Sequence, residues 1–113
     1  MSRNLKSYVI DGYSIEIYSI DKRGKRTRWG DKMITLYSEG INIGQAVFAS
    51  EGEKPPEPYY SEEKIYYFAP SGQYQVVLDL LRNAKPVYFA WRPAHDPKES
   101  TDGDAVFYTD QIK

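Results

Sequence analysis

The sequence contains no cysteine and only one histidine among its 113 residues. The absence of cysteine excludes disulfides, thiolate nucleophiles and cysteine-ligated metal centres together. Small secreted domains often need such cross-links, so the composition favours a reducing compartment, and we expect a cytoplasmic protein. No segment approaches the roughly 20 apolar residues of a transmembrane helix, and no apolar run typical of a signal peptide follows Met1–Lys6. We therefore expect no membrane association.

Catalytic and metal-binding motifs are also missing. His95 and Asp96 could act as a base and its orienting partner, but no serine in a nucleophile-elbow context accompanies them. Carboxylates cluster at Asp96, Glu99, Asp102 and Asp104, yet their spacing does not match a calcium-binding loop. No glycine-rich phosphate-binding loop is present. We therefore predict a non-enzymatic protein without a cofactor or a metal site.

Aromatic residues make up 15% of the chain, and tyrosine supplies 11 of them. The hydrophobic share of 41% suffices for one core, and the length suits a single domain over residues 1–113. A tyrosine ring is apolar, but its hydroxyl needs a partner when it is buried. So many tyrosines favour a sheet surface half exposed to solvent, a protein interface, or both.

Apolar and polar residues alternate in several short segments, as in strands with one buried face. The predicted strands are 13–20, 33–38, 41–49, 64–69, 87–91 and 105–109, with 8–10 as a further short strand or lead-in. The segment 51–63 holds three prolines and five glutamates, so we expect a loop there. Gln45 is anomalous, because it falls between Ile43 and Val47 on a strand face that is otherwise apolar.

One amphipathic helix is predicted over residues 71–82. Its apolar positions recur every three or four residues in one stripe, namely Tyr74, Val77, Leu78 and Leu81, which Val76 and Leu80 widen. Ser71 is placed to cap the first turn, and Asn83 suits a left-handed residue after the last turn. Pro86 prevents the helix from continuing.

The predicted fold class is α+β, with the order β-β-β-β-α-β-β and the helix packed on one face of a mainly antiparallel sheet. Strands that follow one another without a helix between them favour an antiparallel meander. A four-stranded meander followed by a helix is similar to the units of the Whirly and Pur-repeat single-strand-binding proteins, over about residues 13–83. The likeness is one of element order without shared signature residues, so it assigns no site residue.

Positive charge is concentrated in one place on a chain whose net charge is −1. Residues 21–32 contain six basic and two acidic residues, whereas the rest of the chain contains nine basic and 14 acidic residues. Cations on a hairpin loop neutralise phosphates, and a neighbouring indole can stack on an unpaired base. The candidate nucleic-acid-binding residues are Lys22, Arg23, Lys25, Arg26, Arg28, Trp29 and Lys32. We expect single-stranded DNA or RNA, or another polyanion, as the partner.

Two alternatives for this basic segment stay open: it docks on an acidic protein partner, including a second copy of the chain, or it is a solvated turn.

A second surface is predicted from tyrosines that fall beside core-facing positions, namely Tyr18, Tyr37, Tyr66, Tyr88 and Tyr108. On a sheet face left uncovered by the helix, they would form an interface with a protein partner or a homodimer. The alternative function is therefore a protein-interaction or self-assembly module. A ligand pocket between helix and sheet is a third option, for which the sequence shows no convergent polar groups.

Overall fold

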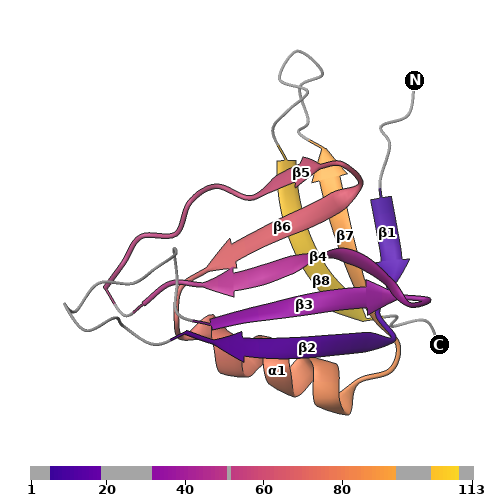
Figure 1. Ribbon diagram of the computed structural model, residues 1–113, viewed down its shortest axis with the longest axis horizontal. Helices are drawn as coiled ribbons and strands as arrows, with labels where there is room; N and C mark the ends of the chain where they lie inside the picture. The colour runs from indigo at the N-terminus through magenta and orange to yellow at the C-terminus, as the bar shows by residue number, and fades with distance from the viewer. Residues whose placement is uncertain (1–5, 19–31, 51, 94–102, 110–113) are drawn as a thin grey trace.

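The computed structural model describes residues 6–18, 32–50, 52–93 and 103–109 (Figure 1). In chain order, the elements are β1 (Lys6–Val9), β2 (Gly12–Ile17), β3 (Lys32–Ser38), β4 (Ile41–Phe48), β5 (Tyr59–Ser61), β6 (Lys64–Ala69), α1 (Gln73–Asn83), β7 (Val87–Pro93) and β8 (Gly103–Thr109). These strands and one helix confirm the predicted α+β class. Two strands extend the predicted order: β1, where the sequence left a lead-in open, and β5, which lies in the segment expected to be a loop.

The strands form two sheets rather than one, a five-stranded sheet of order β2-β3-β4-β6-β5 and a three-stranded sheet of order β1-β7-β8. All neighbours pair antiparallel except β4 and β6, which run parallel. The prediction of an antiparallel meander is therefore wrong here. After β4 the chain crosses to the far edge, forms β5 and returns as β6 between β5 and β4, and parallel neighbours need such a crossover. The likeness to Whirly and Pur-repeat units, which depends on a meander, does not extend to this sheet.

The three-stranded sheet and α1 lie on the same face of the five-stranded sheet, and we call this its inward face (Figure 1). Aromatic rings join the layers. Tyr67 of β6 meets Phe107 of β8 edge to face, with ring centroids 4.9 Å apart, and Phe48 of β4 meets Tyr74 of α1 at 5.4 Å. The largest fully buried side chains are Phe48, Phe89, Ile34, Leu36 and Ile65. Burial of each such side chain stabilises the fold by roughly 1.5–3 kcal/mol.

The helix stripe is confirmed in its central positions, because Val77, Leu78 and Leu81 are buried. The prediction that Val76 widens this stripe is wrong, since Val76 is 59% exposed. The N-cap is Gly72, and no side chain caps the helix, so the predicted Ser71 cap is wrong as well. The backbone amides of residues 73 and 74 instead donate to the carbonyls of residues 70 and 71, which satisfies them without a hydroxyl.

The C-terminal end of α1 also differs from its prediction. Asn83 is the last helical residue, and Ala84 follows it in an extended conformation. The Asn83 side-chain amide donates to the carbonyl oxygen of Asp79, 2.9 Å away, and the Ala84 amide donates to that of Leu80. Two carbonyls of the last turn are thus satisfied without a left-handed residue.

A bulge in β4 explains the anomalous Gln45. Leu36 pairs with Gly44 and Tyr37 with Asn42, so Ile43 is an extra residue on β4 and is only 3% exposed. Beyond the bulge, Gly44 shares the inward face with its partner Leu36, and Gln45 points outward. The predicted assignment, with Gln45 on the apolar face of the strand, was therefore inverted.

Gly44 lies where β4 and β6 approach most closely. Its φ of +147° is in the region that L side chains rarely adopt, and a Cβ atom there would lie 2.1 Å from the carbonyl oxygen of Ile65. Only glycine permits this contact without a shift of one strand.

We predict that Gly44→Ala lowers the free energy of unfolding by about 3 kcal/mol or more, because the added methyl meets the backbone of β6 rather than a side chain that can rotate. Urea unfolding measures the change. Gly72→Ala is the matched control, since its added methyl has nothing within 4 Å, and it should change stability by less than about 1 kcal/mol. Equal stability of the two variants would contradict the close approach of β4 and β6.

Candidate functional site

Most of the predicted basic segment lies outside the described residues: Lys22, Arg23, Lys25, Arg26, Arg28 and Trp29. Lys32, the remaining candidate, opens β3, and its amine lies 5.5 Å from the centroid of the Tyr74 ring, at cation–π distance. The described residues do locate both ends of the segment. Tyr18 follows β2 and Lys32 begins β3, and these strands are antiparallel neighbours. The basic segment is therefore attached at one end of the five-stranded sheet.

The other candidate charges do not form a site in the described part of the chain. His95, Asp96, Glu99 and Asp102 lie outside it. Asp104 faces Arg92 across β7 and β8, with their charged atoms 3.7 Å apart, and both are well exposed, so this pair contributes little stability. Within residues 6–18, 32–50, 52–93 and 103–109, no three acidic or histidine side chains are grouped to hold a metal ion. None of the helical residues described there is part of a helix able to cross a membrane.

The five predicted interface tyrosines are divided between two surfaces. Tyr37 and Tyr66 alternate with core residues of the five-stranded sheet and belong to its outward face, opposite α1. Tyr18 lies on that side too, with its hydroxyl 4.0 Å from the sulfur of Met33. Tyr88 and Tyr108 belong to the outward face of the three-stranded sheet. Because the sheets pack through their inward faces, the two groups point away from each other and do not share one surface.

An aromatic cluster of Tyr59, Tyr66 and Phe68 lies on the outward face of the five-stranded sheet. The Tyr59 ring stacks on Tyr66 with centroids 4.5 Å apart, and on Phe68 at 5.9 Å. Tyr59 is 46% exposed, and the other two rings are partly buried. Sequence reasoning found only Tyr66, because Tyr59 was assigned to a loop. The doubled tyrosines at 59–60 and 66–67 were the available signal, since each pair sends one ring to each face.

A row of apolar side chains connects this cluster with the attachment of the basic segment. Phe68 pairs with Val47, and Val47 pairs with Met33, which directly follows Lys32. Adjacent strands are about 4.8 Å apart, so the backbones of Phe68 and Met33 are separated by roughly 10 Å. The next row on this face is polar and runs from Tyr66 through Gln45 and Thr35 to Ser14. Because Met33, Val47 and Thr35 are only 5%, 8% and 8% exposed, these rows connect the cluster to the attachment of the basic segment through packed side chains. The accessible stacking surface of this face is the aromatic cluster, above all Tyr59.

The outward face of the three-stranded sheet carries a smaller aromatic pair. The rings of Tyr88 and Tyr108 stack with centroids 4.9 Å apart. The Tyr108 hydroxyl lies 2.8 Å from the hydroxyl of Ser7, in hydrogen-bond contact. Val9, which pairs with Tyr88, is 46% exposed. The exposed Arg92–Asp104 pair lies on the same face, so this surface combines exposed apolar area with hydroxyl and charged groups.

Tyr60, the neighbour of Tyr59 on β5, points inward and links the two sheets. Its ring stacks on Trp91 of β7 with centroids 6.3 Å apart, and its hydroxyl is hydrogen-bonded to Tyr8 of β1. Burial raises the pKa of Tyr60 to about 12, with further contributions from the Tyr8 hydrogen bond, the Tyr8 charge and Glu63. Burial also raises the pKa of Tyr67. Both residues act as neutral structural groups at neutral pH.

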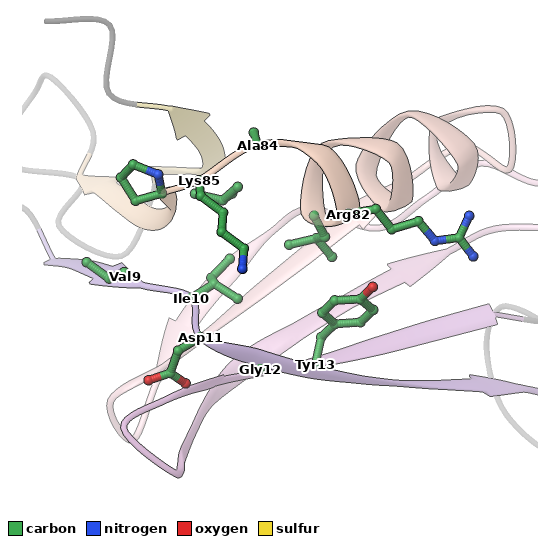
Figure 2. Close-up of a pocket in the computed structure, with 11 residues that line it drawn as sticks. Val9, Ile10, Asp11, Gly12, Tyr13, Arg82, Ala84 and Lys85 are labelled. Atoms are coloured by element: carbon green, nitrogen blue, oxygen red, sulfur yellow. The ribbon is translucent and has the colours of Figure 1, made fainter.

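A groove of about 710 Å³ lies on another side of the molecule, between the junction of β1 with β2 and the C-terminal end of α1 (Figure 2). The candidate sites are therefore two outward sheet faces and one groove. A comparison of the chain with protein-family models, curated proteins and solved structures finds no match in any of the three.

We predict that the free energy of unfolding falls as the pH rises from about 10 to about 12. The folded protein holds the Tyr60 proton more tightly than the unfolded chain, whose tyrosine has the ordinary pKa of 10.0, so deprotonation favours unfolding within this window. Urea unfolding at stepped pH values measures the slope. Tyr60→Phe should make the fall shallower, because it removes a group whose pKa is raised in the folded protein. Identical slopes for the two proteins would be evidence against the inward position of Tyr60.

Proposed function

We propose that this protein binds single-stranded nucleic acid, with bases on the outward face of the five-stranded sheet and phosphates at the basic residues of segment 21–32. The supporting observation is that the aromatic cluster of Tyr59, Tyr66 and Phe68 lies on the sheet beside the end at which this segment attaches. The role is one of binding, without catalysis.

Stacking and charge have different parts in this proposal. A base that stacks on an aromatic side chain gains about 1–3 kcal/mol whatever its identity, so the preference is for unpaired bases rather than for a sequence. Each phosphate contact of a single strand contributes about 0.7 to the slope of log affinity against log salt concentration. The chain outside residues 21–32 has an excess of acidic residues, which disfavours binding of a polyanion elsewhere.

The first prediction concerns the charges. Replacement of Arg23, Lys25, Arg26 and Arg28 by alanine should abolish binding to a fluorescent oligothymidylate, because the phosphates lose their partners. Fluorescence anisotropy measures the affinity. We expect the Tm to stay nearly unchanged, since substitutions of charged residues in a sequence-predicted loop usually alter stability little. If the quadruple variant binds as the parent protein does, the basic segment is not the site.

The second prediction concerns the aromatic cluster. Tyr59→Ser should weaken oligothymidylate binding roughly fivefold or more, because it removes the most exposed ring of the cluster. Tyr108→Ser is the matched control: Tyr108 is 39% exposed against 46% for Tyr59, but it lies on the outward face of the other sheet. Its affinity should match that of the parent protein.

Competition separates nucleic-acid binding from general binding of polyanions. Inorganic polyphosphate has the charge of a nucleic acid but no bases, so it should displace oligothymidylate poorly from the parent protein. Displacement by polyphosphate as effective as by unlabelled oligothymidylate, together with no effect of Tyr59→Ser, would leave only the electrostatic part of the proposal.

As a second candidate function we propose self-assembly through the outward face of the three-stranded sheet. The exposed pair of Tyr108 and Val9, beside the ring of Tyr88, supports it, since apolar groups on an open sheet face favour a protein interface. Light scattering should then show a dimer that Tyr108→Ser converts to a monomer, with little dependence on salt. A monomeric parent protein at all salt concentrations would exclude this candidate.

A further inference from the structure

The groove at the end of α1 has two walls (Figure 2). Residues 9–13 form one wall, where the chain passes from β1 to β2, and residues 81–87 form the other, where it leaves α1 and enters β7. The volume of about 710 Å³ is within the range of about 300–1,000 Å³ that is usual for small-molecule sites. Apolar side chains dominate the lining, namely Val9, Ile10, Leu81, Ala84, Pro86 and Val87.

The polar groups of the groove are few and mainly cationic. The Lys85 side chain extends into the space between the two walls, and the Tyr13 hydroxyl points from β2 toward α1 (Figure 2). The Arg82 side chain points along α1 and away from the Lys85 side chain (Figure 2). No ion pair within the described part of the chain joins either cation to a carboxylate.

Asp11 does not neutralise these cations. Although it lines the groove, its carboxylate points away from the groove in Figure 2 and accepts a hydrogen bond of 2.7 Å from the backbone amide of Glu39. The C-terminal end of α1 contributes only about half a negative charge. The full charge of the Lys85 ammonium exceeds this partial charge, so the groove holds one cation between apolar walls.

We propose that this groove binds a small amphiphilic carboxylate, with its carboxylate at the Lys85 ammonium and the Tyr13 hydroxyl and its apolar body against Ile10, Leu81 and Val87. A single cation extends into the groove, which matches one negative charge better than the multiple convergent donors that favour a phosphate group. The apolar walls add affinity in proportion to the apolar area that the ligand buries. This site lies away from the aromatic cluster and is independent of the nucleic-acid proposal.

The test uses octanoate as the probe, with backbone amide shifts of the full chain followed by nuclear magnetic resonance. Octanoate should produce saturable shifts in residues 10–13 and 81–87. Octan-1-ol has the same apolar chain without the charge and should bind about tenfold more weakly, because a charge-assisted hydrogen bond is lost. Acetate has the charge without the chain and should cause no saturable shift.

Lys85→Met removes the ammonium group but keeps an unbranched apolar side chain. It should weaken octanoate about tenfold and leave the affinity for octan-1-ol unchanged. Lys54→Met is the matched control, because Lys54 is exposed in the loop before β5, and it should leave both affinities unchanged. Unchanged octanoate binding by Lys85→Met, equal affinity of the parent protein for octanoate and octan-1-ol, or shifts outside the groove would each overturn the proposal. None of these results would alter oligothymidylate binding, so the two proposals fail separately.

Discussion

The parallel contact between β4 and β6 is the constraint on which the rest of the structure depends. It exists because Gly44, which has no side chain, allows the Ile65 backbone to approach. The crossover that a parallel pair requires also carries the chain to the far edge, where β5 forms. Tyr59 thereby reaches the outward rings of Tyr66 and Phe68, while Tyr60 reaches Trp91 in the second sheet.

The unequal covering of the five-stranded sheet determines where the candidate sites lie. One face is covered by both α1 and the three-stranded sheet, and the aromatic cluster with its exposed Tyr59 lies on the other (Figure 1). The groove lies where the chain passes between the covering layer and the sheet, because backbone turns fill space less completely than packed strands. Charge also differs between the sites: the basic segment attaches at one end of the five-stranded sheet, where Lys32 lies on the inward side beside Tyr74, and Lys85 lies in the groove.

Periodicity predicted the elements whose partners are near in sequence. The stripe of Val77, Leu78 and Leu81 follows from helical spacing alone, so its prediction did not require knowledge of the strands that pack against it. β5 was missed because the three prolines before Tyr59 indicated a loop. Tyr59–Ser61 forms a strand only because it pairs with β6. The faces of β4 were inverted because one bulge residue, Ile43, reverses the alternation on which the assignment depends.

Sequence alone determined the α+β class, the helix and the concentration of positive charge in one segment, since composition and short-range periodicity express them. Only the tertiary structure decided that Tyr37 and Tyr66 lie apart from Tyr88 and Tyr108, and that Lys85 and Tyr13 line one groove. The physical reason is that strand partners and layer contacts join residues far apart in the chain. Which side of a strand is buried depends on those partners and not on the strand itself.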